Sequence, residues 1–255
     1  GVPFGKSVNR DRLIASIKFD PEHQHLAITN KGVSAVEALV FTNYLMFRNV
    51  YWHHTVRSAT AMFKRAVQDI LIHPDCRLEA TRFHRITEGE LILMLSQEQQ
   101  RLGLPGSSQL LAGTIHRRLH KVGAVIHPGE RNRELMQLLS DLYRNPAKRR
   151  AREIELCEIF GHRLGRKLEG HEILIDIPAF TKSPQVDLKV FYGRDIPGDK
   201  ADPLTFDDPD VSRLRDSLVL NFEDQAKVFR IFCIDDPELR TLVGRQVKND
   251  LNPSA

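Results

Sequence analysis

Cysteine, tryptophan and long apolar runs are scarce in this sequence of 255 residues. The cysteines, Cys76, Cys157 and Cys233, are far apart and odd in number, which excludes a disulfide framework or a zinc-ligand set and is typical of reduced thiols. No apolar run approaches the roughly 20 residues of a membrane-spanning helix, and no signal peptide opens the sequence. These absences predict a cytoplasmic protein without a membrane segment.

A strong charge of either sign is also absent. The formal net charge is +4 and the isoelectric point is near 9.0, which suits an anionic ligand but gives only weak support to nucleic-acid binding. A content of 41% hydrophobic and 27% charged residues excludes extensive disorder. The length permits one large domain or two, with a substantial core.

Glycine and proline are missing from the stretch Val33 to Ile72. Apolar side chains recur there at steps of three and four residues, which is the period of an amphipathic helix. Because the stretch is long for a single helix, it predicts two helices that break near Tyr51–His53. Aromatic, basic and imidazole groups crowd the break, namely Tyr44, Arg48, Tyr51, Trp52, His53, His54 and Arg57.

Tyr44, Arg48 and Tyr51 are spaced to share one face of a helix. A guanidinium between two phenol rings could offer planar donors to a phosphate, while the rings pack on a sugar or base. The structural alternative is a helix pair whose aromatic rings fill a core and whose arginine reaches outward. Spacing alone favours this alternative and leaves both open.

The run FTNYLMFRNVYWHHTVRSATAMF resembles the helix pair after the metal site in HD-domain phosphohydrolases, most closely the branch of deoxynucleoside triphosphate triphosphohydrolases and their bacterial relatives. Its approximate pattern there, aromatic-x-x-hydrophobic-Tyr-x-His-x-x-x-Arg-x-Ala, is met by Phe47, Val50, Tyr51, His53, Arg57 and Ala59. The opening GVPFGKSVNRDRLI is similar to a turn and helix start of the family, with Asn9 in the place of an Asp. HEILIDIP and KVFRIFC resemble the C-terminal region of the same relatives.

The resemblance implies a mostly α chain, α+β overall. We expect residues 1–120 to form the C-terminal half of an all-helical HD-domain core, residues 121–169 a helical connecting region, and residues 170–255 a small α+β subdomain. The family is named for a His…His-Asp…Asp set of metal ligands, and this sequence contains no His-Asp dipeptide.

By the match at Gly1, all four metal ligands would precede the first residue. We therefore expect the sequence to be part of a longer protein, whose N-terminal HD half lies in the same or another chain and binds a divalent metal ion (Mg, Mn, Fe, Ni or Zn). Because hydrolysis in this family needs a metal-bound water, no catalytic residue and no metal ligand is expected in this chain.

The resemblance also implies substrate contacts. Tyr51 would pack against the sugar, while Arg48, His53, His54 and Arg57 would shape or charge the pocket. Asn43 would border the phosphates, in a position where the triphosphohydrolases commonly have Arg. Lys6 and Arg12 are candidates for a phosphate or regulatory nucleotide contact, although GVPFGK lacks the spacing of a P-loop.

The implied activity of the intact protein is the hydrolysis of a dNTP to deoxynucleoside and triphosphate, in a homo-oligomer. Two alternatives remain open. One is a non-catalytic regulatory module that binds a nucleotide or nucleic acid, which the Asn at position 43 favours slightly. The other is an HD nucleotidase that acts on monophosphates.

In the first half of the chain outside the motif, capping residues and turns predict where helices and strands lie. Asn9 or Ser7 can cap a helix Arg10–Ile17, and IKFD and HLAIT form a hairpin. Thr87 and Glu90 form a capping box before a helix Glu88–Leu102. A helix from Ser107 or Ser108 to about Leu119 would place His116 and His120 one turn apart, a spacing with little support as a metal site because basic residues surround it.

The second half of the chain is predicted from the same signals. KVGAVI, HEILIDIP, DLKVFYG and AKVFRIFCI are expected to be strands, with helices in Gly129–Gly165 broken at Asn145–Pro146, a short helix Asp210–Ser217, and a final helix Pro237–Leu251. The basic run Lys148–Arg152 favours a salt-bridged face over a nucleic-acid contact. The pairs Asp207–Asp208 and Asp235–Asp236 are interpreted as caps and not as metal ligands.

Overall fold

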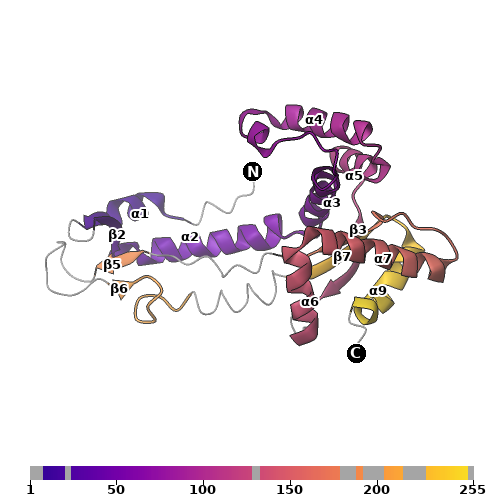
Figure 1. Cartoon of the computed structure of the whole chain (residues 1–255). Coiled ribbons are helices and arrows are strands. Elements are labelled where there is room, and N and C mark those ends of the chain that lie inside the picture. Colours follow the sequence, from indigo (N-terminus) through magenta and orange to yellow (C-terminus); the bar gives the residue numbers. More distant parts are fainter. Residues whose placement is uncertain are drawn as a thin grey trace. The chain divides into compact units, whose positions relative to one another are not determined.

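The structure of the chain is a computed structural model that describes residues 8–20, 24–127, 133–178, 188–191, 204–214 and 228–251. The described parts are mostly α-helical with two small sheets, which confirms the predicted mostly α, α+β class (Figure 1). Contacts between Cα atoms divide the chain into two compact units: unit 1, residues 1–52 with 181–227, and unit 2, residues 53–180 with 228–255. The three-part division expected from the sequence stays a prediction.

Unit 1 begins with the predicted helix and hairpin. Helix α1 (Arg10–Ser16) starts after Asn9, whose side-chain oxygen accepts a hydrogen bond from the Arg12 backbone N–H at 3.0 Å. Strands β1 (Ile17–Asp20) and β2 (His25–Thr29) are antiparallel, as predicted for IKFD and HLAIT. Two further strands complete a sheet of order β1-β2-β5-β6, namely β5 (Lys189–Phe191) and β6 (Leu204–Thr205).

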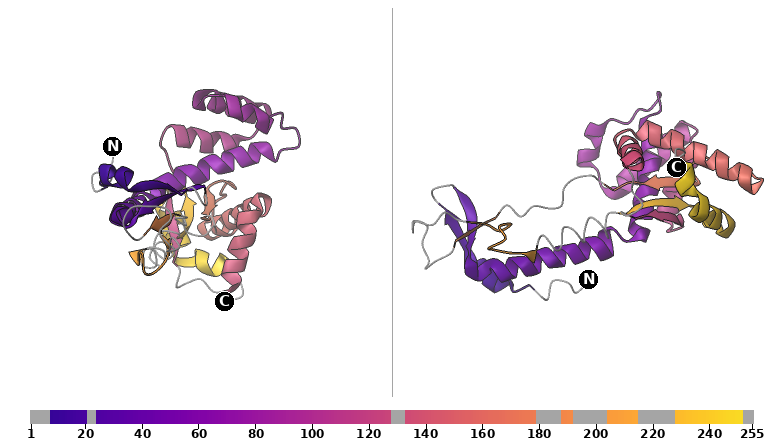
Figure 2. Two further views of the ribbon diagram at one scale, coloured as in Figure 1. Left: turned by 90° about the vertical axis from the view of Figure 1, so that its left-hand side faces the viewer. Right: turned by 90° about the horizontal axis from the view of Figure 1, so that it is seen from below.

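The long helix of unit 1 follows a short 3₁₀ turn, η2 (Asn30–Gly32), and is α2 (Val33–Met46). Its N-terminal end lies beside the hairpin, as Figure 2 shows. Ile28, Val36, Val190 and Phe206 form the core between the sheet, α2 and the segment after β6. Beyond Val36 no residue of α2 is fully buried, so this small core anchors only the first turns of the helix.

Helix α2 ends in a π-helical turn, η3 (Phe47–Tyr51), where the Trp52 backbone N–H donates to the Phe47 carbonyl at 2.8 Å. Helix α3 (His54–Leu71) then starts after His53. The predicted break near Tyr51–His53 is therefore confirmed. The π-turn itself has no signature in the sequence.

Unit 2 is built on an antiparallel sheet of three strands in the order β3-β7-β4. The strands are β3 (Lys121–Ile126), β4 (Ile173–Asp176) and β7 (Phe229–Cys233). The central strand β7 thus comes from the end of the chain and joins two strands that precede it by many residues. Strands β4, β5 and β7 lie where the sequence predicts strands, but β5 pairs with β2 of unit 1.

Helices cover both faces of this sheet (Figure 1). Leu174 and Phe232 face α3 and two helices of the middle of the chain, α4 (Glu88–Arg101) and α5 (Pro105–Ile115). Ile175 and Ile231 face the opposite core. That core is supplied by α6 (Arg133–Arg144), α7 (Pro146–Leu164) and α9 (Pro237–Leu251).

Caps fix several of these helices where the sequence predicts them. Thr87 and Glu90 form the expected capping box of α4. Asn145 caps α7, which ends at Gly165 in the left-handed conformation (φ 66°). Asp236 accepts hydrogen bonds from the backbone N–H groups of Glu238 and Leu239 at the start of α9, which confirms its interpretation as a cap.

The predicted bounds of α5 are wrong at both ends. The helix begins at Pro105, because a proline at the first position of a helix loses no hydrogen bond. It ends at Ile115, because Arg117 takes a left-handed conformation (φ 55°) and the Arg118 N–H bonds back to the Gly113 carbonyl at 2.8 Å. His116 and His120 therefore do not stand one turn apart on a helix. Of the short helix predicted at Asp210–Ser217, residues 210–213 are not helical, and residues 215–217 lie outside the described residues.

A buried ionic network ties α3 to α7. Arg65 binds Asp69 at 2.9 Å, and it also binds Glu153 and the Gly170 carbonyl. The other oxygen of Glu153 accepts the Ile175 N–H at 2.9 Å. Because β4 is an edge strand, this carboxylate satisfies a backbone donor that no neighbouring strand reaches.

The basic run of α7 forms a salt-bridged face, as the sequence favours. Arg150 binds Asp69 at 2.6 Å, Lys148 binds Asp141 at 2.8 Å, and Arg152 binds Glu155 at 2.6 Å. Each of these cations therefore has a carboxylate partner. The fourth cation of the run, Arg149, donates to Gln68 Oε1 at 2.7 Å.

Candidate functional site

The motif residues lie on both sides of the boundary between the two units, which falls between Trp52 and His53. Asn43, Arg48 and Tyr51 belong to unit 1. His53, His54 and Arg57 belong to unit 2. The two groups are therefore described separately.

In unit 1, the aromatic residues near the end of α2 form pairs. The rings of Phe41 and Tyr44 are stacked with centroids 6.2 Å apart, and Tyr51 meets Phe47 edge to face at 5.2 Å. Because a π-turn holds more residues than an α-turn, Tyr51 is rotated relative to the position that α-helical spacing predicts. Its side chain remains 50% exposed, and Arg48 is also exposed.

None of the residues Phe47–Tyr51 is fully buried, so these aromatic rings do not fill a core of unit 1. Asn43 is exposed on the preceding turn. The arrangement leaves an exposed phenol, a guanidinium and an amide on consecutive turns. These groups can pack on a ring and donate hydrogen bonds to oxygen atoms.

In unit 2, the first turn of α3 carries the two histidines of the motif. His53 caps the helix, with Nδ1 accepting from the Thr55 N–H at 3.3 Å, and its ring lies 4.1 Å from that of His54. Partial burial lowers the pKa of His54, and the charges of His53, Arg230 and Lys121 lower it further. Arg57 donates to the Asp176 carboxylate through Nε at 2.8 Å and through a second, bidentate contact.

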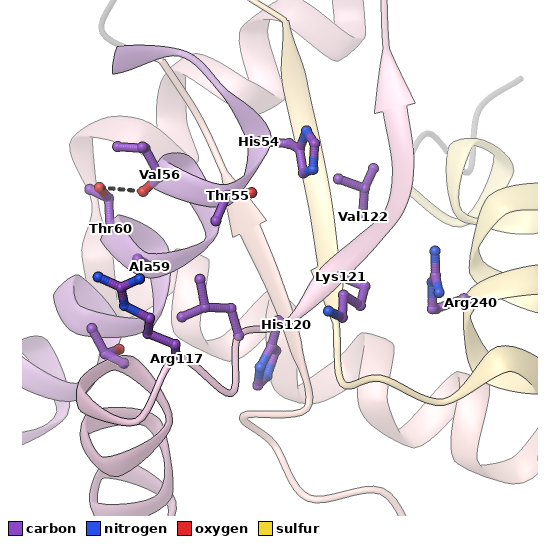
Figure 3. Close-up of a pocket in the computed structure, with 12 residues that line it drawn as sticks. His54, Thr55, Val56, Ala59, Thr60, Arg117, His120, Lys121, Val122 and Arg240 are labelled. Carbon is purple, nitrogen blue, oxygen red and sulfur yellow. Dashed lines mark hydrogen bonds between the residues drawn. The ribbon is translucent and has the colours of Figure 1, made fainter. Parts of the chain in front are cut away.

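His54 lines a pocket of about 800 Å³ in unit 2 (Figure 3). One wall is the first two turns of α3, from His54 to Thr60. The other wall is the start of β3 with the segment that precedes it, from Arg117 to Val122, and α9 adds Arg240. Figure 3 shows the cationic side chains of Arg117, Lys121 and Arg240 placed around this space.

Among the residues that line the pocket none carries a carboxylate. Asp235 lies nearby, 3.7 Å from Lys121 Nζ and 3.6 Å from Arg240 Nη1, and all three side chains are well exposed. Exposed ion pairs of this length are weak. The pocket therefore keeps a positive surplus, and the threonines Thr55, Thr60 and Thr114 add hydroxyl groups.

Sequence reasoning missed Arg117, Lys121 and Arg240. The run HRRLHK signals basic side chains but not the wall that they form. No sequence pattern indicates that this run lies next to Arg240 of α9. Arg117 also takes its left-handed backbone conformation here, a conformation that costs energy for a non-glycine residue and is common at functional sites.

His120 forms the start of the β3 wall and stays neutral. Its Nε2 lies 2.9 Å from the His171 carbonyl, to which it donates, and His171 Nε2 in turn lies 2.8 Å from Gln109 Oε1. Burial lowers the pKa of His120 to about 4, against the opposing effect of the bond to His171. This chain of hydrogen bonds joins His120 to the segment before β4 and to α5.

The remaining predicted residues lie elsewhere. Arg12 is exposed in unit 1, where its Nε donates to the Lys31 carbonyl at 2.8 Å. Lys6 lies outside the described residues. The described parts of the chain hold no group of three or more His, Cys, Asp or Glu residues that could bind a metal ion. A search of the same parts finds no helix with the length and apolar character needed to cross a membrane.

Comparison with known proteins adds two matches. The model of the family described as "HD associated region" matches residues 8–197, more than half of the chain. The structure is similar to the crystal structure of a phosphohydrolase (BT4208) from Bacteroides thetaiotaomicron VPI-5482, with 14% sequence identity and a TM-score of 0.51. That similarity covers 88% of this chain and 55% of the other, and at this identity it shows the fold alone. No curated protein matches the sequence.

Proposed function

The chain belongs to the family of HD associated regions, and on this premise we propose that it supplies part of the nucleotide-binding site of an HD-domain phosphohydrolase. The intact protein would hydrolyse a dNTP to deoxynucleoside and triphosphate. The described residues contain no ligand set for a divalent ion. In this proposal the His, His-Asp and Asp residues of an HD half, in the same or another chain, would hold the ion (Mg, Mn, Fe, Ni or Zn), which would supply an activated water when bound.

The cationic pocket of unit 2 is the observation that carries the proposal. It combines Arg117, Lys121 and Arg240 with His54 of the motif and no carboxylate among the described lining residues. A volume of about 800 Å³ lies in the range of small-ligand sites, about 300–1,000 Å³. Guanidinium and ammonium groups are the side chains that bind phosphate oxygens best.

For the motif residues of unit 1 we propose the nucleotide contacts that the family pattern implies. Tyr51 presents a half-exposed ring that can pack on a sugar, and Arg48 and Asn43 are exposed. Asn43 would border the phosphates. His53 and Arg57 would hold the first turn of α3, and His54 would face the ligand. A position for Arg12 near a phosphate or regulatory nucleotide belongs to the same proposal, as does a homo-oligomeric assembly.

The test of hydrolysis uses the intact protein, with its HD half, and the four dNTPs in the presence of Mg²⁺ or Mn²⁺. We expect deoxynucleoside and triphosphate in equal amounts. Tyr51→Ala should lower kcat/KM by at least about tenfold, a loss of about 1.4 kcal/mol. Tyr143→Ala is the control, because Tyr143 lies on α6 away from the pocket. Unchanged turnover in Tyr51→Ala would contradict the role of Tyr51, and hydrolysis of monophosphates alone would favour a nucleotidase.

A non-catalytic nucleotide-binding module is the second candidate, because the pocket needs no metal ligand to attract an anion. Isothermal titration of the chain with inorganic triphosphate separates binding from hydrolysis. We expect Lys121→Ala to weaken binding about tenfold and to reduce its dependence on salt concentration, because one charge contact is lost. Lys167→Ala removes an equally charged but exposed side chain that does not line the pocket, and should bind like the wild type. Equal losses in both variants would indicate nonspecific attraction.

A further inference from the structure

The first turn of α3 is attached to the sheet of unit 2 by a pair of side chains. Arg57 donates from Nε to Asp176 Oδ2 at 2.8 Å, and its Nη2 donates to the other carboxylate oxygen. The two side chains are only 14% and 6% exposed. Asp176 is the last residue of β4, so the pair joins a helix start to a strand end. A bidentate pair of this kind fixes orientation as well as distance.

The same helical turn forms one wall of the cationic pocket. The Arg57 backbone N–H donates to the His53 carbonyl at 3.0 Å, and His54 and Thr55 line the pocket. The opposite wall includes Lys121 and Val122 of β3, which belongs to the sheet that also contains β4. A link between the helix start and this sheet therefore sets how far apart the two walls stand.

Asp176 also balances the cations around it. Arg230 is its direct partner across strands β4 and β7, so both side chains emerge on the same face of the sheet. Lys64 follows Arg57 two turns later on α3. Burial lowers the pKa of Lys64 and that of Arg230, while in both cases the Asp176 charge acts in the opposite direction. Without this carboxylate, Arg57 and Arg230 would repel each other across the helix–sheet contact.

We infer that Asp176 is a positioning residue for the phosphate pocket: through Arg57 it holds the first turn of α3, and with it His54, at the spacing from Lys121 that a phosphate chain requires. Asp176 does not line the pocket, and its effect on the ligand is exerted through Arg57. The role rests on the proposed function in one respect, namely that the ligand of the pocket is a phosphate.

The test compares Asp176→Asn with the wild-type chain in two measurements. The first is hydrogen exchange of the amides of Arg57 and Ser58, which reports the first turn of α3 without any ligand. The second is the affinity for inorganic triphosphate. We expect the variant to exchange these amides faster and to bind triphosphate about tenfold more weakly, equivalent to about 1.4 kcal/mol. Exchange in the last turns of α3, near Ile70, should change less.

Two further variants separate positioning from a general loss of stability. Ile70→Val removes one methyl group from the fully buried far end of α3, and it costs about 0.5–1.5 kcal/mol of stability. It should leave triphosphate affinity unchanged. Asp176→Glu keeps a carboxylate opposite Arg57 and Arg230, and it should exchange the Ser58 amide more slowly than Asp176→Asn if the charged link holds the helix start.

The outcomes distinguish the two proposals. If Asp176→Asn exchanges like the wild type at Arg57 and Ser58, the positioning role is wrong, whatever the ligand. If Ile70→Val loses as much affinity as Asp176→Asn, the role is structural and the inference also fails. If the wild type does not bind triphosphate although exchange rises in Asp176→Asn, the positioning of α3 stands and the phosphate ligand of the proposed function is refuted.

Discussion

The roles of single residues were predictable from the sequence where they depend on neighbours along the chain. Asn9, Thr87 and Asp236 cap helices by bonding to backbone groups two or three residues away, and a sequence shows such spacing directly. The pocket residues are different. Arg117 and Arg240 line one pocket only because α9 packs on β3, and no local pattern encodes that packing. The motif pointed to His54, whereas its cationic neighbours depend on tertiary structure.

His120 makes a prediction about pH at this scale. Burial lowers its pKa in the folded chain to about 4, from 6.5 for a free histidine. Between these values the unfolded chain binds a proton that the folded chain does not. The stability contributed by neutral His120 is therefore complete above pH 6.5 and is lost as the pH falls toward 4, by up to about 1.4 kcal/mol per unit.

Urea denaturation at several pH values across this window measures the slope. The variant His120→Gln cannot take up the proton, so its stability should fall less steeply than that of the wild type on acidification. It should also be less stable at neutral pH, because the bond to the His171 carbonyl is altered. Parallel slopes for the two proteins would show that His120 is not the group that titrates.

At the scale of elements, the sequence predicts where helices break and strands form, because caps and periodicity are local. The break between α2 and α3 and the capping box of α4 are confirmed. The end of α5 was missed, because the left-handed conformation of Arg117 carries no signal such as a glycine. Asparagine or glycine would have marked that position.

The capping box of α4 gives a prediction for an element. Thr87 accepts the Glu90 N–H, and the Glu90 carboxylate accepts the Thr87 N–H at 2.7 Å. Thr87→Ala leaves a helical N–H unsatisfied and should cost about 1 kcal/mol of unfolding free energy. Thr241→Ala is the control, because its hydroxyl bonds a carbonyl within α9 and caps no helix. Equal stabilities of Thr87→Ala and the wild type would indicate that the start of α4 is frayed.

At the scale of the molecule, strand pairing is the part that sequence could not supply. Six strands were predicted from local patterns, and three of them were expected to form one subdomain at the end of the chain. The structure instead pairs β7 with β3 and β4 inside unit 2, while β5 joins the sheet of unit 1. Pairings over such sequence distances depend on which apolar faces must be buried together, and single strands do not encode their partners.

The central position of β7 leads to a prediction for the whole chain. Removing residues 228–255 deletes the strand between β3 and β4 together with α9. Phe229, Ile231 and Phe232 leave both cores of unit 2, and the N–H and C=O groups of two strands lose their partners. We expect unit 2 to lose its cooperative thermal transition and triphosphate binding with it, although most of its residues precede the truncation. Removing only residues 252–255, beyond the end of α9, is the control and should preserve both. A truncated chain that still melts cooperatively and binds triphosphate would show that β3 and β4 can form the sheet without β7.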